Sequence, residues 1–197
     1  LLFKQMQKNL YLNQKFTKFI NNENFEFDRS KILKILNSDL LEDAYKTISK
    51  WQKYQPTPLE SLNKLSNELK LKNIFYKDES KRFGLKSFKA LGGAYAVEKI
   101  TKGKKDVIVS TATAGNHGKS VAWGAKNLGL NCKIFISENV SETRAEEMRN
   151  LNAEVIRVKG NYEDSLNFCK EESKKNNWEI IQDVAWPDYE LVPKLTM

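Results

Sequence analysis

One lysine of this sequence stands in a context that suits it for covalent chemistry. Lys89 ends the stretch Ser87-Phe88-Lys89, which follows Gly84 and opens a predicted helix near residues 88–100. An amine attacks an aldehyde only in its neutral form, and a partly desolvated position at a helix N-terminus disfavours the ammonium. Phe88 can supply an apolar wall beside that amine. We therefore predict that Lys89, alone among many ordinary surface lysines, forms an imine with an aldehyde.

A second group of polar residues lies between glycines further along the chain. The run Gly115-Asn116-His117-Gly118 falls where a predicted strand feeds a predicted helix. The free backbone N–H groups and the dipole of such a helix start favour an anion, for example a substrate carboxylate. Asn116 can also hydrogen-bond an oxygen of a bound ligand. His117 is the only histidine of the chain, and beside such a turn we expect a packing or capping residue more than a catalytic base.

The elements that must position these residues alternate along most of the chain. Short apolar runs joined by helical patterns predict right-handed crossovers and a parallel sheet flanked by helices, an α/β fold. Ligands of such sheets bind beyond the carboxyl ends of the strands, which is where both motifs fall. The expected strands lie near residues 74–77, 107–110, 133–136, 154–158 and 179–182, and the expected helices near 59–71, 88–100, 117–129, 142–151 and 162–175.

The first part of the chain has a different pattern. Apolar residues recur there at intervals of three to four, which predicts an amphipathic helix over about 30–53, and Pro56-Thr57-Pro58 ends it. We therefore divide the chain into an N-terminal helical segment, residues 1–55, and an α/β region, residues 56–197.

Composition narrows the class of protein. Of the 33 basic residues 28 are lysine, and acidic residues are interleaved with them, so the net charge of +8 indicates a solvated surface and no nucleic-acid partner. No apolar stretch approaches the ~20 residues that a membrane span needs. Cys132 and Cys169 form neither a disulfide framework nor a metal-ligand pattern, which favours the cytoplasm and predicts no metal site.

Taken together, these motifs resemble the fold-type II pyridoxal-phosphate (PLP) enzymes, whose fold is similar to the β subunit of tryptophan synthase. The resemblance runs from about Pro56 to Pro193 and includes the serine and threonine dehydratases. The Ser-Phe-Lys and Gly-Asn-His-Gly motifs are shared across this family. Two further runs point to its ammonia-lyases that act on diaminopropionate, namely Arg82-Phe83-Gly84-Leu85 and Gln182-Asp183-Val184-Ala185-Trp186.

The resemblance implies a role for each candidate residue. Lys89 would bind PLP covalently and move the substrate α-proton, Phe88 would line the cofactor ring, and Asn116 would meet the oxygen on that ring. The turn of Gly115, Asn116, His117 and Gly118 would hold the substrate carboxylate, and Asp183 would act near the substrate amino groups. The resemblance implies a carbon–nitrogen lyase that eliminates the β-amine of 2,3-diaminopropionate to give pyruvate and ammonia. It also implies that the enzyme is a homodimer.

Two departures from the family pattern keep alternatives open. Ammonia-lyases of this type are expected to carry an aspartate just before the Gly-Asn-His-Gly turn, and Ala114 stands there, as it would in an L-serine or L-threonine dehydratase. The glycine-rich phosphate loop of the family also has no counterpart in this sequence, which begins at Leu1. We expect a truncated N-terminal part of a longer enzyme, inactive by itself, with an inactive remnant or a lysine-rich binding module as further alternatives.

Overall fold

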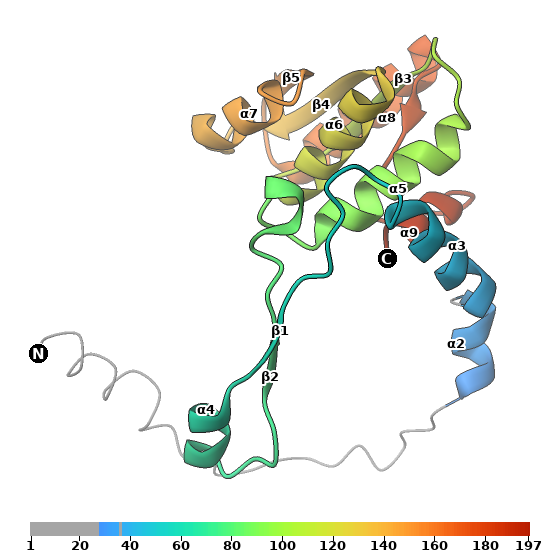
Figure 1. Cartoon of the computed structure of the whole chain (residues 1–197). Helices are drawn as coiled ribbons and strands as arrows, with labels where there is room; N and C mark the ends of the chain where they lie inside the picture. The colour runs from blue at the N-terminus through green and yellow to red at the C-terminus, as the bar shows by residue number, and fades with distance from the viewer. Residues whose placement is uncertain (1–27, 36) are drawn as a thin grey trace, which may run out of the picture. The chain divides into compact units, whose positions relative to one another are not determined.

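The computed structural model describes residues 28–35 and 37–197 (Figure 1). Residues 1–27 and 36, about half of the expected N-terminal segment 1–55, therefore lie outside the described residues. The chain divides into two compact units, residues 1–34 and 35–197. The prediction of one helix over 30–53 is wrong, because helix α2 spans Arg29–Ile35 and a new helix, α3, spans Ser38–Ile48. The side chain of Asn37 accepts a hydrogen bond from the Leu40 N–H at 2.9 Å and so starts α3 as its N-cap.

A parallel sheet forms the centre of the larger unit and confirms the predicted α/β class. Its four strands have the order β5-β4-β3-β6, and every neighbouring pair is parallel. The strands are β3 (Ile108–Ala112), β4 (Asn131–Ser137), β5 (Ala153–Val158) and β6 (Glu179–Ile180). The helices are α5 (Lys89–Thr101), α6 (Asn116–Leu128), α7 (Glu142–Arg149), α8 (Tyr162–Asn176) and α9 (Leu191–Thr196).

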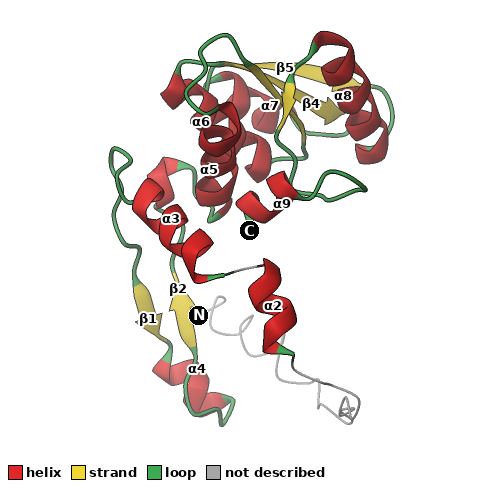
Figure 2. Cartoon of the chain, turned by 90° about the vertical axis from the view of Figure 1, so that its right-hand side faces the viewer, coloured by secondary structure: helices red, strands yellow, loops and turns green. Residues whose placement is uncertain are grey.

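Helices cover both faces of this sheet, as Figure 2 shows. Strand β4 alternates between the two sides: Ile134 and Ile136 pack into one apolar cluster with residues of α5, α6 and α7, whereas Phe135 packs into a second with Leu166 of α8. The side chains of Ile134, Phe135 and Ile136 are all fully buried. Since successive residues of a strand point to opposite faces, this near-continuous apolar run is what a doubly covered parallel strand requires.

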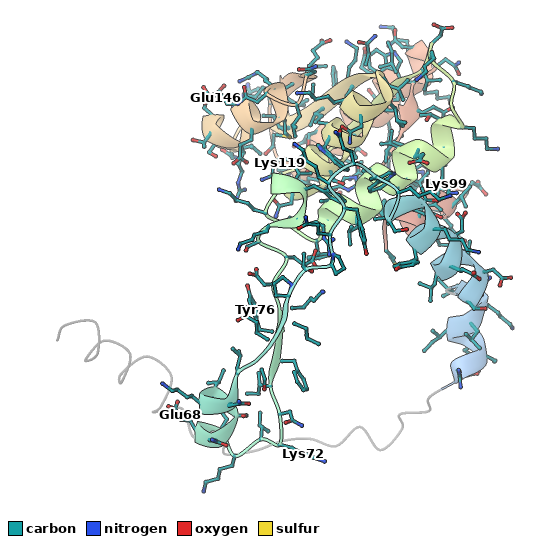
Figure 3. The ribbon with its side chains drawn as sticks, in the orientation of Figure 1. Glu68, Lys72, Tyr76, Lys99, Lys119 and Glu146 are labelled. Carbon is teal, nitrogen blue, oxygen red and sulfur yellow. The ribbon has the colours of Figure 1, made fainter. Side chains whose placement is uncertain are left out.

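Residues 57–79 depart from the predicted pattern. Leu59–Ser61 is a strand, β1, where a helix was expected, and the helix α4 is confined to Asn63–Glu68. Strand β2 (Phe75–Lys77) pairs antiparallel with β1 and takes no part in the parallel sheet. We call β1, α4 and β2 the β1–β2 arm. Tyr76 projects outward from it in Figure 3, and Leu59 and Phe75 are 65% and 61% exposed.

Close contact between α5 and α6 fixes the two helix starts that carry the motifs. The Ala94 N–H donates to Ser120 Oγ at 3.0 Å, and a methyl group added at Gly124 would lie 2.8 Å from the Ala94 Cα. Only glycine at position 124 therefore allows this approach of the two helices. The packing sets the N-terminus of α5, with Lys89, relative to the N-terminus of α6, with Asn116.

We expect Gly124→Ala to destabilise the chain. Alanine favours a helix over glycine by about 1 kcal/mol, whereas overpacking costs about 1–3 kcal/mol. Because the added methyl group meets the Ala94 backbone, we use the upper end of that cost, so a net loss of about 2 kcal/mol should remain. Urea unfolding measures it, with Asn127→Ala at an exposed position of the same helix as the control. Equal unfolding midpoints for Gly124→Ala and the parent chain would contradict the proposed tight contact.

The same helices bear on membrane association. Among the described residues, none of the helices combines the length and the apolar character that crossing a bilayer requires.

Candidate functional site

A cavity of about 600 Å³ opens beyond the carboxyl end of β3, where the sheet geometry predicts a ligand. Such a volume falls in the range of small-molecule sites. Both sequence motifs contribute to it, together with residues that follow β6 and others from α7 and α8. The lining consists of Lys89, residues 112–117, Lys119, Arg144, Glu147, Tyr162 and residues 183–184.

Lys89 and Asp183 meet in this cavity although 94 positions separate them in the sequence. The Lys89 Nζ donates to Asp183 Oδ2 at 2.7 Å, and the two side chains are 43% and 23% exposed. Lys89 is the first residue of α5, and its backbone N–H donates to Ser87 Oγ at 3.2 Å. The serine of the Ser-Phe-Lys motif thus fixes the backbone of the lysine, while Asp183 fixes its amine.

The Asp183 carboxylate is held in its ionised form. Burial by itself would raise the pKa of Asp183, but the positive charges of a protonated His117 and of Lys89, with the Lys89 hydrogen bond, lower it below its usual value. Burial lowers the pKa of His117 and keeps that ring neutral near pH 7. The positive charge that stabilises the Asp183 carboxylate at this pH is therefore that of the Lys89 ammonium. Asp183 is therefore a standing negative charge beside the lysine amine.

His117 is buried and oriented by the backbone. Its side chain is only 4% exposed, and Nε2 donates to the Ile181 carbonyl at 2.8 Å. In that tautomer Nδ1 carries no proton, and it lies 3.7 Å from Asp183 Oδ2. The ring therefore packs the turn of α6 against the chain that follows β6, and the one nitrogen it turns toward the site is an acceptor.

Thr113 shapes the glycine turn at the start of α6. Its Oγ1 accepts from the backbone N–H groups of Gly115 at 3.0 Å and Gly118 at 3.2 Å. A methyl group on Gly118 would come within 2.3 Å of Thr113 Cγ2, so this glycine permits the turn to close. The N–H groups of Asn116 and His117 fall in the first turn of α6, where no intrahelical acceptor exists. They are the donors that an anion in the cavity can use.

Gln182 is a site component to which sequence reasoning assigned no role. It is fully buried, and its Oε1 accepts from Thr111 Oγ1 and from the Ala112 N–H. Its Nε2 donates to the Ala112 carbonyl and to the Tyr162 hydroxyl at 2.9 and 2.8 Å. The amide thus joins the end of β3 to the segment with Asp183. The available signal was its place beside Asp183 in the quoted motif, but its partners Tyr162, Ala112 and Thr111 lie 20, 70 and 71 positions away.

Phe88 occupies a different place from the other predicted residues. It precedes the first residue of α5, its side chain is 66% exposed, and the cavity lining in the described part of the chain does not include it. Its contact with a cofactor ring stays a prediction.

This arrangement is typical of enzymes that bind small molecules beyond the carboxyl ends of a parallel sheet. A lysine lies at one helix start there, and an anion-binding turn lies at another. Residues 50–191 match the family model described as pyridoxal-phosphate dependent enzyme. The chain belongs to this family.

Two curated relatives indicate where in the family the chain falls. It is 37% identical over 162 residues to the diaminopropionate ammonia-lyase of Escherichia coli K12, a match that covers 73% of this chain and 41% of the relative. It is 34% identical over 134 residues to the biosynthetic L-threonine dehydratase of Haemophilus influenzae, covering 68% of this chain and 26% of the relative.

A solved structure agrees with this placement. The E. coli diaminopropionate ammonia-lyase in complex with an aminoacrylate-PLP azomethine reaction intermediate superposes with a TM-score of 0.82 at 34% identity, covering 90% of this chain and 48% of that one. The chain spans about half the length of the ammonia-lyases that it matches.

The residues of the cavity fit the reactive end of PLP. An aldehyde needs an amine, which Lys89 presents in a partly buried setting next to a carboxylate. An anionic ring oxygen needs a hydrogen-bond donor, and Asn116, whose side-chain amide can donate, is one of the residues that line the cavity. Lys89 and Asn116 therefore remain the residues of this chain that we predict to hold the cofactor.

Proposed function

We propose that the complete protein is a carbon–nitrogen lyase that acts on 2,3-diaminopropionate. The α-proton and the β-amine leave the substrate, and hydrolysis of the remaining three-carbon unit consumes one water. The products are pyruvate and two molecules of ammonia, so that atoms and charge balance. PLP supplies the electron sink that makes loss of the α-proton possible.

The observation that carries this proposal is the contact of Lys89 with Asp183 inside a cavity that also holds an anion-binding turn. Once its own proton is lost, the Lys89 Nζ can bind the cofactor and, when displaced by the substrate amine, accept the α-proton. Its position 2.7 Å from Asp183 Oδ2 keeps the amine aimed at one place in the cavity. Proton transfer depends on such positioning.

The charges of the cavity suit a substrate with two amino groups and one carboxylate. The ionised Asp183 attracts an ammonium group, and the donors at the start of α6 attract the carboxylate. The neutral His117 ring adds no positive charge beside the amines. These features support the proposal that the substrate is an amino acid with a second amino group.

Dehydration of L-serine or L-threonine is the second candidate. Ala114 favours it, because a methyl group lines the cavity at the position where ammonia-lyases of this type are expected to carry a carboxylate. The threonine dehydratase relative supports the same alternative at lower coverage.

Substrate profiling of the complete, PLP-loaded protein separates the two candidates. We expect kcat/KM for L-2,3-diaminopropionate to exceed that for L-serine and L-threonine by at least about tenfold, the effect of about 1.4 kcal/mol. Ammonia assays provide the control, because diaminopropionate releases two ammonia per oxo acid and the hydroxy amino acids release one. A preference for L-threonine would establish the dehydratase, and no turnover of any of the three would indicate an inactive remnant.

We also propose that the protein works as a homodimer in the cytoplasm, without a nucleic-acid or membrane partner. The state of the two cysteines supports the compartment: Cys132 and Cys169 are free and buried, and burial raises the pKa of their thiols to about 12 and about 11. Such thiols are inert and unpaired, as expected in a reducing environment. Light scattering of the complete protein tests the dimer.

A further inference from the structure

The cavity contains one positive charge that no carboxylate of the described chain neutralises. Lys89 is paired with Asp183, and Lys119, which Figure 3 labels on α6, is paired with Glu147 of α7 at 3.0 Å. The third cation of the lining is Arg144 of α7. Among the contacts of the described residues, its guanidinium donates only to the Ala114 carbonyl, from Nη1 at 3.0 Å.

Arg144 lies against the anion-binding turn. A methyl group added to Gly115 would lie 3.9 Å from Arg144 Cδ and Nε, an ordinary van der Waals distance, so the Arg144 side chain passes directly beside the turn. One Nη donor is used by the Ala114 carbonyl, and a guanidinium has five N–H donors. The remaining donors are available to an anion that also accepts from the start of α6.

We propose that Arg144 binds the α-carboxylate of the substrate together with the N–H groups of the first turn of α6, and that it makes the site selective for a free carboxylate. This inference rests on the proposed function, since it assigns one end of the substrate in the same cavity. Arginine suits the task because its planar fork matches a carboxylate. The unneutralised charge adds long-range attraction that the turn alone does not provide.

The sharpest test compares a carboxylate ligand with its uncharged carboxamide. L-Alanine and L-alaninamide carry the same amine and methyl group but differ at the carboxyl position, and neither has a leaving group on Cβ. Their equilibrium binding to the complete, PLP-loaded protein is measured by titration calorimetry. Arg144→Gln should weaken L-alanine about tenfold, as expected for an exposed charge-assisted hydrogen bond, and leave L-alaninamide within twofold.

Two further variants distinguish binding from a structural effect. Arg149→Gln is the matched control on the same helix, because Arg149 pairs with Glu142 and does not line the cavity; it should change neither affinity. Arg144→Lys keeps the charge without the fork and should recover part of the loss. With L-2,3-diaminopropionate, Arg144→Gln should raise KM about tenfold and change kcat by less than about threefold.

The outcomes separate this inference from the proposed function. Equal weakening of L-alanine and L-alaninamide by Arg144→Gln would show that the residue only supports the Ala114 peptide and would overturn the inference, as would no effect on either ligand. Selective loss of L-alanine binding in a protein that does not turn over diaminopropionate would uphold Arg144 as the carboxylate ligand while the proposed reaction fails.

Discussion

Replacing Lys89 by alanine in the complete protein should remove the visible absorbance of lysine-bound PLP and lower the rate of pyruvate release by more than about 10³-fold. On the roles proposed for Lys89, the variant loses both the amine that holds the cofactor and the group that moves the α-proton, and proton transfer alone contributes about 10²–10⁴-fold. Absorbance spectra and a coupled pyruvate assay measure the two effects. Added amines in the buffer should restore part of the turnover but not the lysine-bound spectrum.

Lys86 provides the matched control for this experiment. It lies three positions before Lys89, and its side chain is exposed outside the cavity lining. Lys86→Ala should keep the spectrum and the rate of the parent. If Lys86→Ala lost both while Lys89→Ala kept them, the assignment of the reactive lysine would be wrong.

The second large effect concerns the choice between the two mirror-image substrates. The complete protein should prefer L- over D-2,3-diaminopropionate by about 10²–10⁴-fold in kcat/KM, the usual worth of a general base. A D-isomer held by the same carboxylate contacts presents its α-hydrogen to the face away from Lys89. The methyl group of Ala114, which lines the cavity, cannot accept a proton there.

Two variants at this position separate proton transfer from shape. Ala114→Asp should raise activity on the D-isomer more than on the L-isomer, whereas Ala114→Asn, of nearly the same size but without a basic oxygen, should not. The cavity lining holds two carboxylates, Asp183 and Glu147, and Asp183 is our candidate to act in place of the missing one. Comparable kcat/KM for the two isomers, persisting in Asp183→Asn, would mean that neither carboxylate governs the choice.

The sequence predicted the parallel sheet because its strands are bounded by local signals. Strands β3, β4 and β5 overlap the apolar runs expected at 107–110, 133–136 and 154–158. The error at 59–71 has a physical cause: leucines at 59, 62, 65 and 69 imitate a helical face, but Leu59, Leu65 and Leu69 are exposed, and pairing with residues 75–77 makes the first of them part of a strand. Pairing across a connection cannot be read from local periodicity.

The sequence allowed several residues of the site to be predicted one by one, but not which residues lie next to one another in space. Lys89, Asn116, His117 and Asp183 were each identified from their motifs, and all four line the cavity. Arg144 and Tyr162 were not, since their partners lie 30 and 20 positions away and nothing in their local sequence marks them. Gln182 was noted only as part of a family motif, because its partners in β3 lie 70 and 71 positions away. Their positions follow from the crossover connections of the sheet.

The 94 positions between Lys89 and Asp183 also set a time at which the site can first exist. Chains are synthesised at about 5–20 residues per second, so about 5–20 s pass after Lys89 is made before its partner follows. Asp183 comes just after β6, the last of the described strands, which must pair with β3 to bring it into place. The Lys89 amine and the Asp183 carboxylate therefore come together only when β6 pairs with β3. We expect the cofactor to bind at this site only after that step of folding.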